Sequence, residues 1–265
     1  MKILILTVAG MSNRFSESLG YACHKCIYSE KGIEESLLYR MIYLDGGFDC
    51  YVIVGGFMYE ELKSVLEENF KDIRDKITLI RNGHYSDYGS GYSLYLALER
   101  VREMDFNEVV FAEGDLYVDK ESFQALCSTS GNIISCNREE IVASKAVAFY
   151  FDKNKGIHYV YDTGHDVIEI KEPFTGIFNS GQIWKFADPN YLRKTIDSMD
   201  REEWTGTNLA LIQKYFGSLD RSQYNIITFK KWMNCNTVFD YRKIKEKEKH
   251  ENAERKIKYI QGACI

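Results

Sequence analysis

The residues best suited to phosphate chemistry lie near the start of the chain. An apolar run, Ile3 to Val8, ends at a small-residue break that contains Gly10, and Arg14 follows it. A tight turn after a buried strand exposes several backbone N–H groups, which can bind phosphate oxygens together with the planar donors of an arginine. Lys25 lies further on, in a polar segment, and can fold back over the same anion. This stretch therefore predicts an anion-binding turn, and the alternative is an ordinary strand and turn with a surface arginine.

A second position suits a metal ion. Asp115 follows the apolar run Glu108 to Ala112 and comes directly after Gly114. Mg²⁺ prefers oxygen ligands and is usually held by one or two carboxylates together with substrate phosphates. The alternative is a turn aspartate that caps the next helix, which is common. Glu113 and Asp119 are neighbouring carboxylates that remain open as alternatives.

Composition limits the kind of protein that can hold these residues. The 265 residues are 45% hydrophobic, which is enough for a full core, so we expect one α/β domain over residues 1–265. The formal net charge is −5 and no long basic block occurs, which argues against a nucleic-acid surface. No apolar run approaches the ~20 residues needed to span a membrane. Seven scattered cysteines favour reduced thiols in a cytoplasmic protein.

Strands and helices alternate through the first half of the sequence. The pattern predicts strands at 3–8, 50–54, 77–80 and 108–112, and helices at 34–44, 58–70 and 92–101. Such alternation indicates a mostly parallel sheet with helices on both faces. Ligands bind beyond the carboxyl ends of the strands in such sheets, so the Gly10 turn and Asp115 should meet at one edge.

The second half has shorter strands separated by polar turns. We expect strands at 132–136, 142–151, 156–161, 167–170 and 224–229, an apolar segment at 178–186, and helices at 189–199 and 206–215. The residues from about 242 to 260 are dense in Lys, Glu and Arg, which predicts a solvated C-terminal helix with i,i+4 pairs.

The opening stretch resembles nucleotidyltransferases with a GT-A-like, Rossmann-like fold. These open with a strand, then A-G-x-G-[ST]-R-[FL], then Pro-Lys about ten residues on. Here the run from Ala9 to Phe15 is AGMSNRF, and His24-Lys25 follows. Ser12, Asn13 and His24 depart from the pattern, and a side chain at Ser12 narrows the room around a triphosphate. The resemblance implies catalytic roles for Arg14 and Lys25, and nucleotide binding by the residues Ala9, Gly10, Met11, Ser12, Asn13 and Arg14.

The resemblance also implies two metal ligands. The family has its metal-binding aspartate in a hydrophobic strand followed by x-[GA]-D, which here is Phe111 to Asp115. A second ligand comes from a short apolar strand followed by x-[ND]-[ST]-x-x-D-[LY], which places Asn236 at the ligand position. An amide oxygen is a weaker ligand, so a Mg²⁺ site would depend more on Asp115 and on the phosphates.

The stretch from Asn82 to Leu96 is the most specific part of the resemblance. It is similar to the phosphocholine cytidylyltransferase branch, which has a Tyr-x-Asp-Tyr run and a Tyr-Ser-Leu-Tyr-Leu helix start. The resemblance implies that Asn82, Gly91 and Ser93 line the base pocket, and that CTP is the donor. Gly55, in the family's V-G-G-[YF], is implied to bind nucleotide as well.

Acceptor-binding residues are implied less directly. Lys171 lies in a swapped version of the family's E-K-P, and Asn179 and Trp204 are further candidates. The tryptophans Trp184, Trp204 and Trp232 would suit a box around a quaternary amine. Aromatic residues are abundant, however, and core packing is their default role.

Together these features predict a cytoplasmic nucleotidyltransferase. It would move CMP from CTP to a small phosphorylated acceptor, such as a phosphocholine-like amino alcohol, a polyol phosphate or a sugar phosphate. It would release pyrophosphate and use Mg²⁺, with no nucleic-acid or membrane partner, in a pathway to cell-surface polysaccharide precursors. We leave a homodimer open. The alternatives are a GT-A glycosyltransferase, which normally carries D-x-D at the metal site, and a non-catalytic nucleotide-binding regulatory module.

Overall fold

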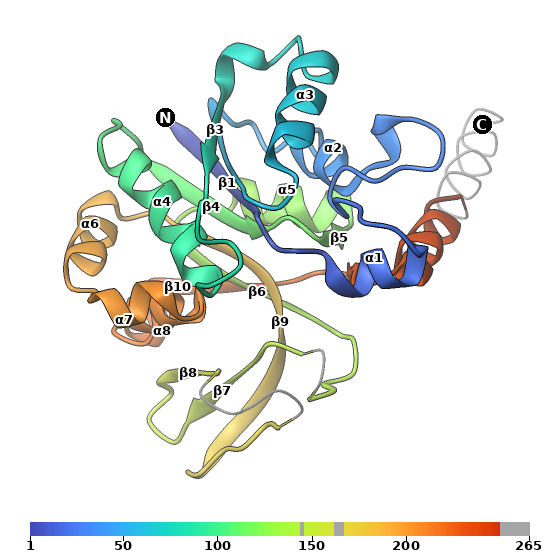
Figure 1. The fold of residues 1–265 in the computed structure, drawn as a ribbon. Helices are drawn as coiled ribbons and strands as arrows, with labels where there is room; N and C mark the ends of the chain where they lie inside the picture. Colours follow the sequence, from blue (N-terminus) through green and yellow to red (C-terminus); the bar gives the residue numbers. More distant parts are fainter. Residues whose placement is uncertain (144–145, 162–166, 250–265) are drawn as a thin grey trace, which may run out of the picture.

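The computed structural model describes residues 1–143, 146–161 and 167–249. Among these residues a nine-stranded sheet forms the centre of the molecule, and seven of its strands follow the order β10-β6-β9-β4-β1-β2-β3 (Figure 1). All strands on this path except β9 run in the same direction, because β9 pairs antiparallel with both β4 and β6. The fold is therefore the predicted α/β architecture with a mixed, mostly parallel sheet.

The described strands have the following bounds: β1 Lys2–Val8, β2 Cys50–Gly55, β3 Ile77–Arg81, β4 Glu108–Glu113, β5 Leu116–Val118, β6 Asn132–Asn137, β7 Ala148–Asp152, β8 Ile157–Val160, β9 Phe174–Phe186, β10 Tyr224–Thr228 and β11 Trp232–Asn234. The α-helices are α1 Asn13–Leu19, α2 Leu37–Ile42, α3 Tyr59–Asn69, α4 Ser90–Arg102, α5 Lys120–Ser128, α6 Pro189–Asp197, α7 Arg201–Thr205 and α8 Leu209–Phe216. Short 3-10 helices are η1 Ile33–Glu35, η2 Arg74–Lys76 and η3 Arg221–Gln223, and residues 238–249 are helical.

Side-chain alternation along β1 explains why helices cover both faces of the sheet. Successive side chains of a strand point to opposite faces, so a strand with no polar alternation must be buried on both. Ile3 and Ile5 pack in one core cluster, whereas Leu4 and Leu6 pack in another. The first cluster is closed by α4, α6, α7 and α8, and the second by α2, α3 and α5.

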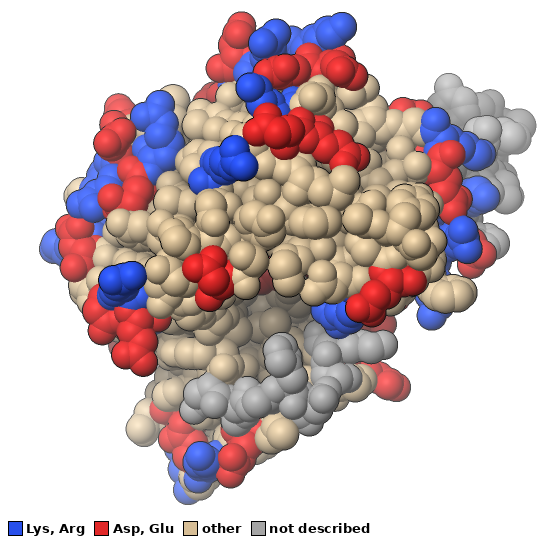
Figure 2. Space-filling model, viewed as in Figure 1, with Lys and Arg blue, Asp and Glu red and all other residues tan. Residues whose placement is uncertain are grey.

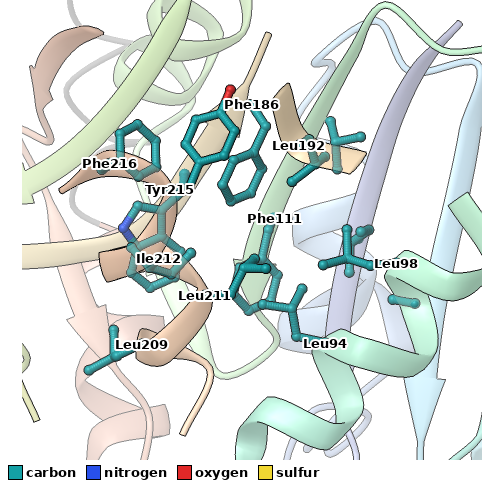
Figure 3. Close-up of a cluster of buried hydrophobic side chains, with 14 of the residues drawn as sticks. Leu94, Leu98, Phe111, Phe186, Leu192, Leu209, Leu211, Ile212, Tyr215 and Phe216 are labelled. Atoms are coloured by element: carbon teal, nitrogen blue, oxygen red, sulfur yellow. The ribbon is translucent and has the colours of Figure 1, made fainter. Parts of the chain in front are cut away.

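The first cluster is rich in aromatic and leucine side chains, as Figure 3 shows. Phe111 of β4 and Phe186 of β9 face Leu94 and Leu98 of α4, with Leu211 of α8 between them. These side chains are fully buried. Each such buried side chain contributes about 1.5–3 kcal/mol, so this packing holds α4 and α8 against β4 and β9. β4 is one of the two strands whose carboxyl ends form the site.

A hairpin extends the sheet on one side. β7 pairs with β8 and with the first half of β9, and in Figure 1 this part projects below the main sheet. β9 runs for 13 residues, and its second half crosses the centre between β4 and β6. β9 therefore joins the projecting hairpin to the core.

Several of the predicted helix and strand boundaries are wrong. The predicted helix at 34–44 is divided into η1 and α2 because Ser36 is extended and accepts a hydrogen bond from the backbone N–H of Tyr39, so it begins a new helix. The predicted strand at 142–151 begins only at Ala148. The predicted strand at 167–170 does not form, and these residues have no regular secondary structure. Part of the predicted helix at 242–260 lies outside the described residues.

Charged side chains lie mostly at the edges of the face seen in Figure 2, around a broad band without charge. No extended patch of Lys and Arg covers this face of the described chain. Within the described residues no helix is both long enough and apolar enough to cross a membrane.

The turn before α4 packs against the connection between α7 and α8, and this contact should contribute to stability. The backbone N–H of Gly89 donates to Thr205 O (2.8 Å), and a Cβ at Gly89 would overlap the carbonyl of Gly206. Gly89→Ala should therefore lower the free energy of unfolding by about 1–3 kcal/mol in urea. Gly83→Ala is the matched control, because its added Cβ meets nothing within 4 Å. Equal stability of the two variants would contradict this packing.

Candidate functional site

The turn after β1 forms one wall of the site. Ser12 adopts φ 55° and ψ 27°, a left-handed conformation that glycine adopts at little cost. This geometry gives a physical reason for the glycine that the resembling family has at this place. The Ser12 hydroxyl accepts a hydrogen bond from the backbone N–H of Lys25 (3.3 Å), so it ties the turn to the next segment.

Lys25 and Asp115 come together at the carboxyl ends of β1 and β4. Lys25 Nζ donates to Asp115 Oδ2 at 2.5 Å, and both side chains are largely buried. Burial opposes the lysine charge, but the Asp115 carboxylate outweighs it and raises the pKa of Lys25. The parallel pairing of β1 with β4, with Thr7 opposite Glu113, brings these two distant parts of the sequence to one edge.

Arg14 and Asn236 form a second pair, an exposed hydrogen bond between a cation and a neutral amide. Arg14 Nη2 donates to Asn236 Oδ1 at 2.8 Å. Asn236 is placed by β11, which pairs antiparallel with β5 and sets the backbone N–H of Cys235 against Asp115 O at 2.8 Å. Each predicted phosphate-binding cation therefore contacts one predicted metal ligand.

Glu113 and Asn208 complete the floor between these elements. Asn208 Nδ2 donates to Glu113 Oε1 (2.9 Å), and the backbone N–H of Asn208 donates to Ser90 Oγ (3.1 Å). Burial and the nearby Asp115 carboxylate together raise the pKa of Glu113 to about 7, while the Asn208 hydrogen bond and the Lys25 charge act in the opposite direction. Sequence reasoning missed the role of Asn208, although a Thr-Asn pair before a helix was a visible signal.

A cavity of about 210 Å³ lies above this floor. Its lining includes residues from the β1 turn, the β4 end and the loop before α4, namely Thr7, Val8, Ala9, Gly10, Lys25, Cys26, Asn82, Tyr85, Tyr88, Gly89, Ser90, Ser93, Glu113, Asp115 and Asn208. Asn82 Nδ2 donates to Ser93 Oγ (2.9 Å), and Asn82 Oδ1 accepts from the backbone N–H of His84. These contacts fix the loop that faces the β1 turn.

The predicted nucleotide-binding residues divide into two groups. Ala9, Gly10, Asn82 and Ser93 line this cavity. The other predicted residues do not line it. Met11, Ser12 and Asn13 form the outer turn, and Arg14 lines a neighbouring cavity. Gly55 packs under Tyr59 and Leu62, and Gly91 packs against the connection between α7 and α8.

The neighbouring cavity is larger, about 810 Å³, and it contains Arg14 and Asn236. Of the predicted acceptor residues, only Asn179 lines it. Lys171 is exposed and contacts Glu169 (3.7 Å). Trp204 lies on α7, where it packs against Tyr95 on a different side of α4.

The residues at the edge fit a Mg²⁺ ion. Asp115 Oδ1 is buried and has no hydrogen-bond partner in the described part of the chain, so an oxygen ligand is available there. The described residues contain no group of three or more His, Cys, Asp and Glu that would hold a metal without help. Asp115 with Asn236 would therefore need oxygens from a ligand, which is how Mg²⁺ is usually bound.

The Cys23-x-x-Cys26 pair, of which Cys26 is buried and Cys23 half-buried, has the properties of unreactive thiols. Burial raises the pKa of Cys23 to about 11 and that of Cys26 to about 12, so neither is a thiolate at neutral pH. All cysteines in the described residues are free.

Comparisons with solved structures define the fold class. The chain resembles a CTP:phosphocholine cytidylyltransferase from Streptococcus pneumoniae (TM-score 0.64, 15% identity, 92% of this chain and 98% of that one). It also resembles an inositol-1-phosphate CTP transferase from T. maritima (TM-score 0.63, 16% identity, 92% and 95%). A third similar structure is a nucleoside-diphosphate-sugar pyrophosphorylase from Vibrio cholerae (TM-score 0.59, 14% identity, 92% and 99%). The chain therefore has the fold of these nucleotidyltransferases.

The family is shown by a model match over residues 21–248. The chain belongs to the family described as "Domain of unknown function (DUF6564)". No curated protein matches it.

His24, at the position where the nucleotidyltransferase pattern has proline, should make the stability of the protein depend on pH. Its ring is fully buried, and burial lowers the pKa of His24 to about 4 from the ordinary 6.5. On acidification the unfolded chain takes up this proton near pH 6.5, while the folded protein resists it down to about pH 4. The free energy of unfolding should therefore fall by about 2–3 kcal/mol over this range through His24 alone.

Urea unfolding at several pH values measures this contribution as the difference between the wild type and His24→Gln. The difference in unfolding free energy should change between pH 6.5 and 4 and be flat above pH 7. His84→Gln is the control, because its ring is partly exposed. A difference that does not vary with pH would contradict the buried neutral imidazole.

Proposed function

We propose that this protein is a nucleotidyltransferase that moves CMP from CTP to a small phosphorylated acceptor and releases pyrophosphate. The observation that carries the proposal is the pairing of Lys25 with Asp115 and of Arg14 with Asn236 at one sheet edge, beside a cavity between the β1 turn and the Asn82 loop. Two cations and two oxygen ligands are the groups that a triphosphate and its metal require.

The 210 Å³ cavity is the proposed nucleoside site. It is bordered on one side by the Gly10 turn and on the other by the loop that Asn82 and Ser93 fix. A Cβ at Gly10 would meet nothing within 4 Å, so the backbone there leaves room for phosphates. Tyr85 and Tyr88 supply flat surfaces at the cavity wall against which a base can pack.

The proposed reaction is an in-line displacement. An oxygen of the acceptor phosphate forms a bond to the α-phosphorus of the nucleotide, the bond from that phosphorus to the bridging oxygen breaks, and pyrophosphate leaves. Arg14 binds the β- and γ-phosphates, and Lys25 meets the charge that develops at the α-phosphate. Asp115 and Asn236 would hold Mg²⁺, which would neutralise phosphate charge when bound.

The alternative activities differ in what they consume. A GT-A glycosyltransferase would use a sugar nucleotide, and the sequence at its metal site would normally be D-x-D, whereas this chain has Glu113-Gly114-Asp115 with Glu113 bonded to Asn208. A regulatory module would bind nucleotide without turnover. Pyrophosphate release from an NTP in the presence of phosphorylated acceptors separates these possibilities.

Replacing Asp115 tests the proposed metal ligand. Asp115→Asn removes the carboxylate but keeps the side-chain size, so pyrophosphate release should fall by at least about 100-fold if the carboxylate holds the metal. The free energy of unfolding, measured in parallel, reports whether the fold is intact. Asp75→Asn is the matched control, because Asp75 is an exposed aspartate distant in sequence from Asp115. Turnover close to the wild type in a folded Asp115→Asn variant would refute the assignment.

The preference for CTP is a separate prediction. Cytosine has an amino donor at C4 and an acceptor at N3, whereas uracil has a carbonyl acceptor and an N–H donor at these positions. A buried site built for one base therefore leaves groups unpaired with the other. That loss costs about 1–3 kcal/mol, so CTP should bind roughly tenfold or more tightly than UTP. Calorimetric titration of CTP, UTP, GTP and ATP with Mg²⁺ measures the order. Tighter binding of UTP or a purine nucleotide would overturn the preference while leaving nucleotidyl transfer in place.

A further inference from the structure

The larger cavity adjoins the proposed reaction centre. Its lining includes Arg14 and Asn236, residues 137–140 at and after the end of β6, and Asn179 of β9. Arg138, Lys230 and Lys243 add positive charge to the lining, and Glu139, Glu140 and Asp240 add negative charge. A cavity of about 810 Å³ that is contiguous with Arg14 is large enough for a small phosphorylated molecule.

Two buried oxygens of this cavity's lining residues lack hydrogen-bond donors. Asn179 Nδ2 donates to the carbonyls of Glu139 (3.5 Å) and Glu140 (3.3 Å), which fixes the orientation of the amide. Its Oδ1 is buried, and so is Asn234 Oδ1, and neither has a partner in the described residues. A buried acceptor without a donor is costly, and side chains in a site retain such atoms where a ligand supplies the donor.

The tryptophans do not form a cage for a quaternary amine. Trp184 is fully buried in the core and its Nε1 donates to Tyr159 OH (2.7 Å). Trp204 packs on Tyr95, away from this cavity. Only Trp232 of the three lines it, with its Nε1 bonded to Gly181 O (2.8 Å). A quaternary ammonium ion needs several aromatic faces and has no N–H to donate, so this cavity is unsuited to it.

We propose that the acceptor is the phosphomonoester of a polyhydroxylated compound, a polyol or a sugar, and that Asn179 and Asn234 select it. Its phosphate lies beside Asn236, the proposed metal ligand in this cavity's lining, and its hydroxyl groups donate to Asn179 Oδ1 and Asn234 Oδ1. This inference rests on the proposed nucleotidyl transfer, and it separates the hydroxylated acceptors from the choline-like one. Asn234 precedes Asn236 by two residues, so the same segment would contact both the acceptor and the metal.

Calorimetry with small probes tests the inference. Glycerol 3-phosphate, glucose 1-phosphate and phosphocholine are titrated into the full chain saturated with a nonhydrolysable CTP analogue and Mg²⁺. At least one hydroxylated probe should bind about tenfold or more tightly than phosphocholine, because only the hydroxylated probes donate to the two amide oxygens. Asn179→Ala and Asn234→Ala should each weaken binding of that probe about tenfold and leave phosphocholine and the CTP analogue unchanged.

Asn225→Ala, an exposed asparagine on β10, is the matched control and should change nothing. Asn234→Ala keeps the test valid if Asn179→Ala disturbs the 139–140 loop. Binding of phosphocholine as tight as the hydroxylated probes, or no binding of either hydroxylated probe while the CTP analogue binds, would overturn the inference and leave nucleotidyl transfer standing. Failure of the CTP analogue itself to bind would instead overturn the proposed function and this inference with it.

Discussion

The ion pair between Lys25 and Asp115 is the contact on which the arrangement of the site depends. It joins the segment after the β1 turn to the loop after β4 at 2.5 Å, in surroundings where both side chains are largely buried. A buried charge without a partner is strongly unfavourable, so each residue holds the other in place. Because Lys25 and Asp115 satisfy each other's charge, a ligand that separates them must supply a new partner to each. A phosphate for Lys25 and a metal ion for Asp115 would do so together. Arg14 is exposed and bonded to the neutral amide of Asn236, so it can take a phosphate without losing a buried partner.

Much of the fold follows from the sequence because its signals are local and strong. The run Ile3 to Val8 has no polar alternation, so it predicts a strand buried on both faces, and the structure confirms this through its two core clusters. The elements that escaped prediction depend on distant partners. The apolar segment predicted at 178–186 is the later part of β9, which begins already at Phe174 because β7 pairs with its first half. α5 was missed although Asp119 caps it through the backbone N–H of Ser122.

The positions of site residues could be predicted where a single residue directly follows a strand. They could not be predicted where they depend on contacts between residues far apart in the sequence. Asp115 and Gly10 could be placed at one sheet edge from strand order alone. Asn208 could not, since its bond to Glu113 depends on how α8 packs against α4 and β4. Trp204 shows the error of inference from residue type alone, because its indole packs against Tyr95 of α4 and does not line the larger cavity. Ser12 and His24 depart from the family's pattern, yet one holds the left-handed turn and the other is a neutral core residue.

The central claim is that the cavity between the β1 turn and the Asn82 loop binds a nucleoside triphosphate. The most direct measurement is a crystal structure of the protein grown with a nonhydrolysable CTP analogue and Mg²⁺. We expect the base in the 210 Å³ cavity, the phosphates at Gly10 and Arg14, and Lys25 separated from Asp115. Nucleotide bound elsewhere, or bound with the Lys25–Asp115 pair intact, would contradict it.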